Sequence, residues 1–275
     1  MNLQDLQNKI SHFPKTEKMP VLFLAHGSPM NAIEENQFVQ GFRNIATTLP
    51  KPKAILCVSA HWFTNGTFVT SGEIQKTIHD FSGFPPALYQ VEYPAKGSPQ
   101  LAEETTQLLL PAIATETENW GLDHGAWSVI IHLYPDADIP VIQLSIDYTK
   151  NADYHYELAK NLQKLRERGI LIIGSGNVVH NLRMLDFSQI DTVGFGYDWA
   201  KEAQEKTNEW ILDGNFKNLL EYDKQGRFLQ LAVPTPDHFL PLIYTLGLKE
   251  KTDAVQLFND ELLGGSLSMT SVLIG

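Results

Sequence analysis

The sequence contains a single cysteine, Cys57, among its 275 residues, and this scarcity excludes two kinds of structure. An internal disulfide needs two cysteines and a thiolate metal cage needs several, so the composition fits a reducing compartment. Long apolar runs are also missing, since no uncharged apolar segment approaches the roughly 18 residues of a membrane-spanning helix. The N-terminal segment has no apolar signal-peptide core. We therefore expect a cytoplasmic protein that does not enter a membrane.

Positive charge is scarce as well. The chain has 21 Lys and Arg residues against 32 Asp and Glu residues, which gives a formal net charge of -11. A surface of this sign repels nucleic acids and anionic membranes over most of its area. The expected partners are therefore small molecules, and the sequence predicts no oligomeric state.

Short apolar runs alternate with amphipathic helical stretches along the chain, which is typical of an α/β protein. Several runs are continuous and β-branched, as expected of strands covered on both faces. The predicted strands are 21–25, 54–60, 67–71, 140–146, 170–176 and 266–275. The predicted helices are 36–48, 99–110, 152–168, 197–212 and 236–246. We predict one α/β domain with a central, largely parallel or mixed sheet and helices on both faces.

Three histidines follow predicted strands: His26 after VLFLA, His61 after AILCVSA, and His180 four residues after ILIIGSG. The carboxyl ends of strands in an open α/β sheet gather along the edge where ligands bind. Small residues beside each histidine leave space for a ligand close to the backbone. A lone strand-end histidine is usually structural, but the repetition favours a metal site at this edge of the sheet.

A fourth candidate ligand is His238, in the first turn of the predicted helix 236–246 with Thr235 as its N-cap. The positive end of a helix dipole favours a neutral imidazole, which is the form that binds metals. Without thiolates, a cluster of imidazoles indicates Zn²⁺ or Fe²⁺ rather than Ca²⁺ or Mg²⁺. We therefore predict one divalent metal ion.

The other five histidines lack this pattern. His124, in WGLDHGAW, has either a catalytic or substrate-facing role or a packing role in a loop. His79, in IHDFSGFP, either contacts substrate or belongs to a turn. The remaining three are interpreted as surface residues: His12, His132 and His155.

Two competing motifs are weak. GSGN at 174–177 lacks the third glycine of a dinucleotide-binding loop, and Ser28 lacks the G-x-S-x-G elbow of a serine hydrolase. An aromatic and proline-rich set following His61 either forms a wall for a planar ring or packs in the core. Its members are Trp62, Phe63, Phe81, Phe84, Pro85, Pro86 and Tyr89.

Together, several segments resemble the class III extradiol ring-cleavage dioxygenases, in particular their bacterial 4,5-DOPA dioxygenase extradiol members. The segments are LFLAHGSPMNAIE, ILCVSAHWF, TIHDFSGFPPALYQVEYP, GLDHGAWSVI, YPDADIPVIQLSID, GSGNVVHNLR, PTPDHFLPLIYTLG and GSLSMTSVLIG. The resemblance covers residues 19–275 and implies one extradiol dioxygenase-like domain, with residues 1–18 as an N-terminal extension.

The resemblance also implies roles for the histidines. His26, His61 and His238 would hold the metal, His180 would be a fourth ligand or the nearby base, and His124 would be an acid/base residue of the pocket. More distant ring-cleaving relatives use two histidines and a glutamate, and His238 stands at the glutamate position. An all-imidazole set suits Zn²⁺ as well as Fe²⁺, so either metal is expected.

The implied activity is that of an oxidoreductase that inserts O₂ into a catechol such as L-DOPA. The 4,5-cleavage would yield a seco-DOPA semialdehyde and would require Fe²⁺. Arg183, after the HNL of GSGNVVHNLR, is a candidate partner for a substrate carboxylate or a surface residue. Two alternatives remain open. One is a zinc-binding, non-oxidative protein, and the other is a protein like the tetrapyrrole metal chelatases, because the segment LAHGS resembles their strand-end histidine.

Overall fold

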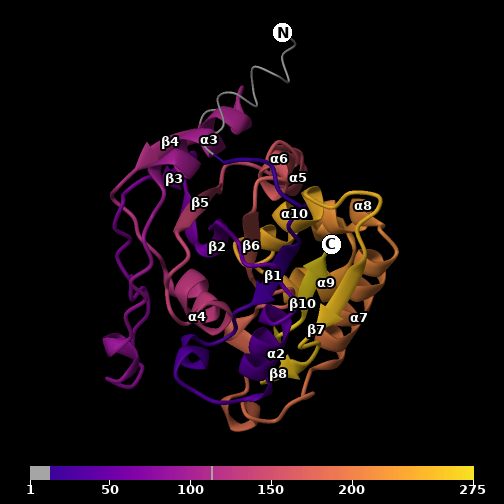
Figure 1. Cartoon of the computed structure of the whole chain (residues 1–275). Helices are drawn as coiled ribbons and strands as arrows, with labels where there is room; N and C mark the ends of the chain where they lie inside the picture. The colour runs from indigo at the N-terminus through magenta and orange to yellow at the C-terminus, as the bar shows by residue number, and fades with distance from the viewer. Residues whose placement is uncertain (1–12, 113) are drawn as a thin grey trace.

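A computed structural model describes residues 13–112 and 114–275 (Figure 1). His12 lies outside the described residues. Of the predicted N-terminal extension, residues 13–18 are described, and they lie against the domain: Thr16 N donates to Glu167 O at 2.6 Å, and Lys18 Nζ lies 2.6 Å from Asp253 Oδ1. Among the described residues, no helix combines the length and the apolarity needed to cross a membrane.

The strands form an eight-stranded mixed sheet and a short two-stranded one. The large sheet has the order β4-β3-β5-β2-β6-β1-β10-β7, and β8 pairs with β9. The strands are β1 (Val21–Ala25), β2 (Ala54–Thr64), β3 (Thr67–Thr70), β4 (Ala114–Thr117), β5 (Val141–Asp147), β6 (Ile170–Gly176), β7 (Val255–Phe258), β8 (Leu262–Leu263), β9 (Leu267–Ser268) and β10 (Ser271–Ile274).

Helices cover both faces of this sheet (Figure 1). They are α2 (Gln37–Ala46), α3 (Pro99–Leu109), α4 (His124–Leu133), α5 (Ala152–Lys160), α6 (Gln163–Arg166), α7 (Asp198–Leu212), α8 (Phe216–Leu220), α9 (Arg227–Ala232) and α10 (Leu240–Gly247). Short 3-10 turns join them: η1 (Pro29–Ala32), η2 (Leu88–Gln90), η3 (Leu182–Met184), η4 (Phe187–Gln189) and η5 (Tyr222–Lys224).

The central strands β5, β2, β6 and β1 run parallel, so their carboxyl ends meet at one edge. Strand β3 pairs antiparallel with β5 and parallel with β4, while β10 pairs antiparallel with both β1 and β7. The predicted single α/β domain with a mixed sheet is therefore confirmed, and the parallel part supplies the edge where the histidines lie.

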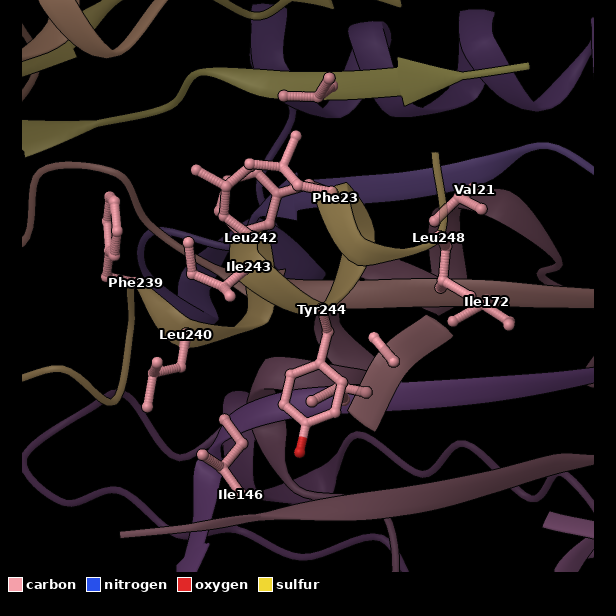
Figure 2. Close-up of a cluster of buried hydrophobic side chains, with 14 of the residues drawn as sticks. Val21, Phe23, Ile146, Ile172, Phe239, Leu240, Leu242, Ile243, Tyr244 and Leu248 are labelled. Atoms are coloured by element: carbon pink, nitrogen blue, oxygen red, sulfur yellow. The ribbon is translucent and has the colours of Figure 1, made fainter. Parts of the chain in front are cut away.

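Each central strand contributes side chains to two separate cores because successive residues point to opposite faces. In β1, Val21 and Phe23 belong to the core on one face, while Leu22 and Leu24 belong to the core on the other. Figure 2 shows α10 in the first core, with Leu242 and Tyr244 packed among side chains of the strands. Helices α2 and α4 cover the second core.

The predicted strands 21–25 and 170–176 match β1 and β6, and the side chain of Ser98 caps α3. Several predicted boundaries are wrong. The predicted helix 152–168 is interrupted between α5 and α6, the predicted strand 266–275 is divided into β9 and β10, and the predicted helix 236–246 begins only at Leu240. Strand β4 and the edge strand β7 were not predicted.

Candidate metal centre

Five histidine rings gather at the carboxyl edge of the parallel strands. The ring centroid of His26 lies 5.0 Å from that of His61, 5.2 Å from that of His238 and 5.6 Å from that of His124. The centroid of His61 is 5.0 Å from that of His238 and 3.8 Å from that of His124. His180 stacks on His238, with centroids 3.5 Å apart and planes inclined by 7°. The structure thus brings together all five histidines that the sequence put forward as ligands or catalytic groups.

His26 lies directly after β1, where the chain turns sharply. Gly27 adopts a φ of +61°, and a Cβ atom there would lie 2.6 Å from the sulfur of Met269. Glycine meets both demands because it tolerates the left-handed region and has no side chain. The turn leaves His26 only 1 % exposed at the edge of the sheet.

His61 lies inside β2 and not beyond its end, which corrects the predicted boundary at residue 60. The pairing of β2 with β5 shifts register between Val58 and Phe63, so a bulge surrounds His61. A bulge redirects side chains on an otherwise regular strand. Strand β2 can therefore continue while its imidazole turns towards the other histidines.

His238 lies in a turn directly before α10 and not in the first turn of that helix, which corrects its predicted position. The amides of Phe239 and Leu240 both donate to the carbonyl of Pro236, which closes this turn ahead of the helix. Gly176 at the end of β6 makes room for it, because a Cβ there would lie 2.1 Å from His238 O. Part of the GSGN motif therefore serves close packing of the His238 turn on the sheet.

Each of three rings has an acceptor beside its Nδ1 atom. His26 Nδ1 lies 3.0 Å from Ser175 Oγ, and His61 Nδ1 lies 3.3 Å from Asp80 Oδ2. His238 Nδ1 is hydrogen-bonded to Asp237 Oδ2. An ionised carboxylate only accepts hydrogen bonds, so His238 donates from Nδ1 to Asp237, and the Asp80 carboxylate favours a proton on Nδ1 of His61.

Burial disfavours the charged form of three of these rings. It lowers the pKa of His26 and of His61 well below the usual histidine value, and repulsion from neighbouring rings adds to the effect. Burial also lowers the pKa of His180 to about 3, with His238 as the next contributor. The pKa of Asp80 is lowered although burial opposes this, because hydrogen bonds to His124 and attraction to His124 and His61 stabilise the carboxylate. Neutral imidazoles flanked by ionised carboxylates are typical of metal ligands with outer acceptors.

His124 is the first residue of α4 and therefore lies in a helix and not in a loop. Asp123 caps the helix and is held by the Ser59 hydroxyl at 2.6 Å and the Gln143 amide at 2.7 Å. Asp80 Oδ1 accepts from the His124 backbone amide at 2.9 Å and lies 3.0 Å from its Nδ1. Asp80 therefore contacts both His61 and His124.

An aromatic group borders the histidines on the side of His124. The centroid of Phe81 lies 5.5 Å from that of His124, 5.3 Å from that of Phe84 and 5.1 Å from that of Tyr89. His79 belongs to this group and not to the ligand cluster, with its centroid 5.8 Å from that of Phe81. Its Nε2 lies 3.0 Å from the carbonyl of Val91.

Two histidines interpreted as surface residues are buried. His132 is 8 % exposed and its Nε2 lies 2.7 Å from Asn31 O, while His155 is fully buried with its Nδ1 2.9 Å from the Tyr244 hydroxyl. Both predictions are wrong. The burial could not be foreseen from neighbouring residues, because Asn31 and Tyr244 lie far from these histidines in the sequence. Arg183 is exposed in η3.

The sequence interpretation missed three residues that contact the rings: Asp80, Asp237 and Ser175. Two of them carried a local signal, since Asp237 precedes His238 and Asp80 follows His79 in the chain. Ser175 carried none, because it reaches His26 only through the pairing of β6 with β1.

Among the described residues, three histidines each offer a ligand atom within 4.8 Å of the others, and so could hold a metal ion: His26, His61 and His124. Residues 11–266 match the family described as the catalytic LigB subunit of aromatic ring-opening dioxygenase. The chain belongs to this family. As a member of the aromatic ring-opening dioxygenases it is an oxidoreductase, and enzymes of this family use a metal.

Individual relatives of this dioxygenase agree with the assignment. The chain is 47 % identical to the 4,5-DOPA dioxygenase extradiol of Escherichia coli K12, over 94 % of this chain and 95 % of that protein. It is 36 % identical to the protein of the same name from Beta vulgaris, over 90 % and 94 % respectively. A crystal structure of an uncharacterized Escherichia coli K12 protein superposes with a TM-score of 0.81 at 42 % identity, covering 94 % of this chain and all of that one.

Proposed function

We propose that this protein is an extradiol dioxygenase that opens the ring of a catechol such as L-DOPA, giving the 4,5-cleavage product seco-DOPA semialdehyde. The names of its relatives from Escherichia coli and Beta vulgaris support this substrate class. One divalent ion, Fe²⁺ or Zn²⁺, would be held by His26, His61 and His238. The lone cysteine and the acidic composition support a cytoplasmic protein with small-molecule partners.

One observation carries this proposal. The Nε2 atoms of His26 and His61 lie 3.1 Å apart, while the Nδ1 atom of each ring faces an acceptor. With the protons on Nδ1, the two Nε2 lone pairs point at each other in a buried place and repel. A cation between them removes the repulsion, so the donor set fits a metal ion.

The separations of the rings support His238 as the third ligand. Imidazoles that share an ion through nitrogen at about 2.1 Å have ring centroids separated by roughly 5 Å. The three centroid separations among His26, His61 and His238 are 5.0, 5.2 and 5.0 Å. His180 cannot bind the same ion in its ring plane, since it stacks nearly parallel to His238 at 3.5 Å. We therefore assign His180 as the base and not as a fourth ligand.

A bound Fe²⁺ would supply a site for the catechol oxygens and O₂ and would transfer electrons between them, whereas Zn²⁺ has no redox chemistry. The protein's own groups move the protons. His180 is unprotonated at neutral pH because its pKa is lowered to about 3, so its ring can accept a proton from a catechol hydroxyl. His124 is assigned as the second acid/base group, with the Asp80 carboxylate 3.0 Å from its Nδ1 to hold a proton there.

The aromatic side chains beside His124 suit a planar substrate. Phe81 and Tyr89 retain exposed surface next to the histidines, and aromatic rings favour offset or edge-on contacts with other rings. They would orient the catechol while His180 and His124 exchange protons with it.

The test is anaerobic loading of the metal-free protein with Fe²⁺, followed by L-DOPA and oxygen. We expect oxygen uptake together with the yellow absorbance of a semialdehyde, and neither from the Zn²⁺-loaded protein. His61→Ala should lose metal and turnover together. Metal binding without oxygen uptake under Fe²⁺ would instead support a zinc-binding, non-oxidative protein, and metal insertion into a porphyrin would support a chelatase.

A further inference from the structure

We propose that Ser175 is a positioning residue that selects the tautomer of His26 and so makes its Nε2 available to the metal. The inference rests on the proposed function and extends it to a residue outside the ligand set. Ser175 Oγ lies 3.0 Å from His26 Nδ1 and also makes a short hydrogen bond to the carbonyl of Gly125. Ser175 is fully buried, so water does not take over either contact.

The direction of the hydrogen bonds follows from counting protons. A carbonyl oxygen only accepts, and a serine hydroxyl has a single proton to donate. That proton goes to Gly125 O, which leaves the Ser175 oxygen with lone pairs towards His26. His26 must then donate from Nδ1, and its own lone pair lies on Nε2.

The strands fix the positions of this relay, the two hydrogen bonds that run from His26 through Ser175 to Gly125. Ser175 is in register with Leu24 of β1 on one side and with Ser59 of β2 on the other. Gly125 has no room for a side chain, because a Cβ would lie 2.5 Å from Ser59 Oγ and 2.8 Å from His61 Cδ2. The Gly125 carbonyl therefore approaches the sheet closely enough to accept from Ser175. The relay links the sheet to the first turn of α4.

His26 differs in this respect from the other two proposed ligands. Asp80 and Asp237 orient His61 and His238 with carboxylates, which accept hydrogen bonds only. A hydroxyl can donate as well as accept, so Ser175 imposes a tautomer only because Gly125 takes its proton. Without the Ser175 hydroxyl, His26 could place its proton on Nε2 and donate it to His61 Nε2, 3.1 Å away. That hydrogen bond would have to break before a metal could bind.

The direct test is the tautomer of His26 in the metal-free, full-length protein, read from ¹⁵N shifts of labelled histidine and assigned by loss of the signals in His26→Asn. We expect the proton on Nδ1 in the wild-type protein. A proton on Nε2 there would overturn the proposal, whatever the variants do.

The second test is Ser175→Ala, with Ser145→Ala as its control. Ser145 is also a buried strand serine, but its hydroxyl contacts Thr64 and the Phe68 amide and no histidine. We expect Ser175→Ala to weaken Zn²⁺ binding about 10–100-fold and to move the His26 proton to Nε2, while Ser145→Ala leaves both unchanged. Equal Zn²⁺ affinity and an unchanged tautomer in Ser175→Ala would refute the role of Ser175. No Zn²⁺ or Fe²⁺ binding by the wild-type protein would refute the metal site itself.

Discussion

Asp80→Asn is the substitution that most directly tests how the carboxylates orient the metal centre. The carboxylate of Asp80 accepts from the His124 backbone amide at 2.9 Å and also lies 3.0 Å from His124 Nδ1 and 3.3 Å from His61 Nδ1. Asparagine has the same shape but only one acceptor oxygen. The fixed backbone amide will take that oxygen, which turns the asparagine NH₂ group towards His61. His61 must then accept at Nδ1 and carry its proton on Nε2.

The magnitude follows from the atoms involved. A proton on His61 Nε2 points at His26 Nε2, 3.1 Å away, and the hydrogen bond between them occupies the proposed metal position. Loss of an outer acceptor of a ligating histidine typically reduces metal affinity 10–100-fold. This corresponds to about 1.4–2.7 kcal/mol at room temperature. We expect a loss of this size in Zn²⁺ affinity for Asp80→Asn, together with a larger loss of Fe²⁺-dependent turnover because the negative charge beside His124 Nδ1 is also removed.

The assay is a competition titration of Zn²⁺ against a coloured chelator, combined with oxygen uptake on L-DOPA after loading with Fe²⁺. Asp138→Asn is the matched control, because Asp138 is an exposed carboxylate that pairs with Lys51 and contacts no histidine. It should leave both measurements unchanged. Zn²⁺ affinity and turnover of Asp80→Asn equal to those of the wild-type protein would refute the orienting role of Asp80.

Three further changes test the packing around the site and the core. Gly125→Ala places a Cβ 2.8 Å from His61 Cδ2, so we expect a loss of about 1–3 kcal/mol in urea unfolding and weaker Zn²⁺ binding; unchanged values would mean that the helix shifts freely. Burial lowers the pKa of His155 to about 4. As the pH falls from 6.5 to 4, the unfolded chain therefore binds a proton at this residue before the folded protein does. The free energy of unfolding, which is highest above pH 6.5, then falls by about 1.4 kcal/mol per pH unit. His155→Gln should lack this part of the acid sensitivity. If the unfolding free energies of the variant and of the wild-type protein changed in parallel with pH, the prediction would be wrong. Asp253→Asn leaves the fully buried Arg166 without its charged partner at 2.7 Å, and should cost about 3–5 kcal/mol in urea unfolding; a loss below 1 kcal/mol would show that the pair contributes little.

The sequence was most informative where a local pattern has a fixed geometric consequence. Continuous apolar runs predicted the central strands, and parallel strands place their carboxyl ends at one edge, so His26 and His61 could be expected to approach each other. The local backbone conformation at each histidine was harder to predict. A bulge at His61 and a turn before α10 at His238 depend on register and on packing against β6, which no short segment contains.

The side chains that orient the rings were hard to predict for the same reason. Ser175 reaches His26 only because β6 pairs with β1, and Asp80 reaches His61 only because the loop between β3 and η2 returns to β2. The buried state of His155 likewise depends on the Tyr244 hydroxyl, which comes from α10. Long-range pairing decides these contacts, and one sequence provides no direct signal of it.

Each of the three proposed ligands is oriented by an oxygen atom beside its Nδ1, although the local backbone structure differs from one to the next. A strand end with a hydroxyl relay orients His26, a bulge with a neighbouring loop carboxylate orients His61, and a turn with its own preceding aspartate orients His238. The common outcome is a proton on Nδ1, and its importance follows from the 3.1 Å between two Nε2 atoms. At that distance, a single misplaced proton joins His26 to His61 by a hydrogen bond worth about 0.5–1.5 kcal/mol, which a metal must then break. The outer acceptors therefore have to favour the Nδ1 tautomers by more than this amount for the site to stay open to an ion.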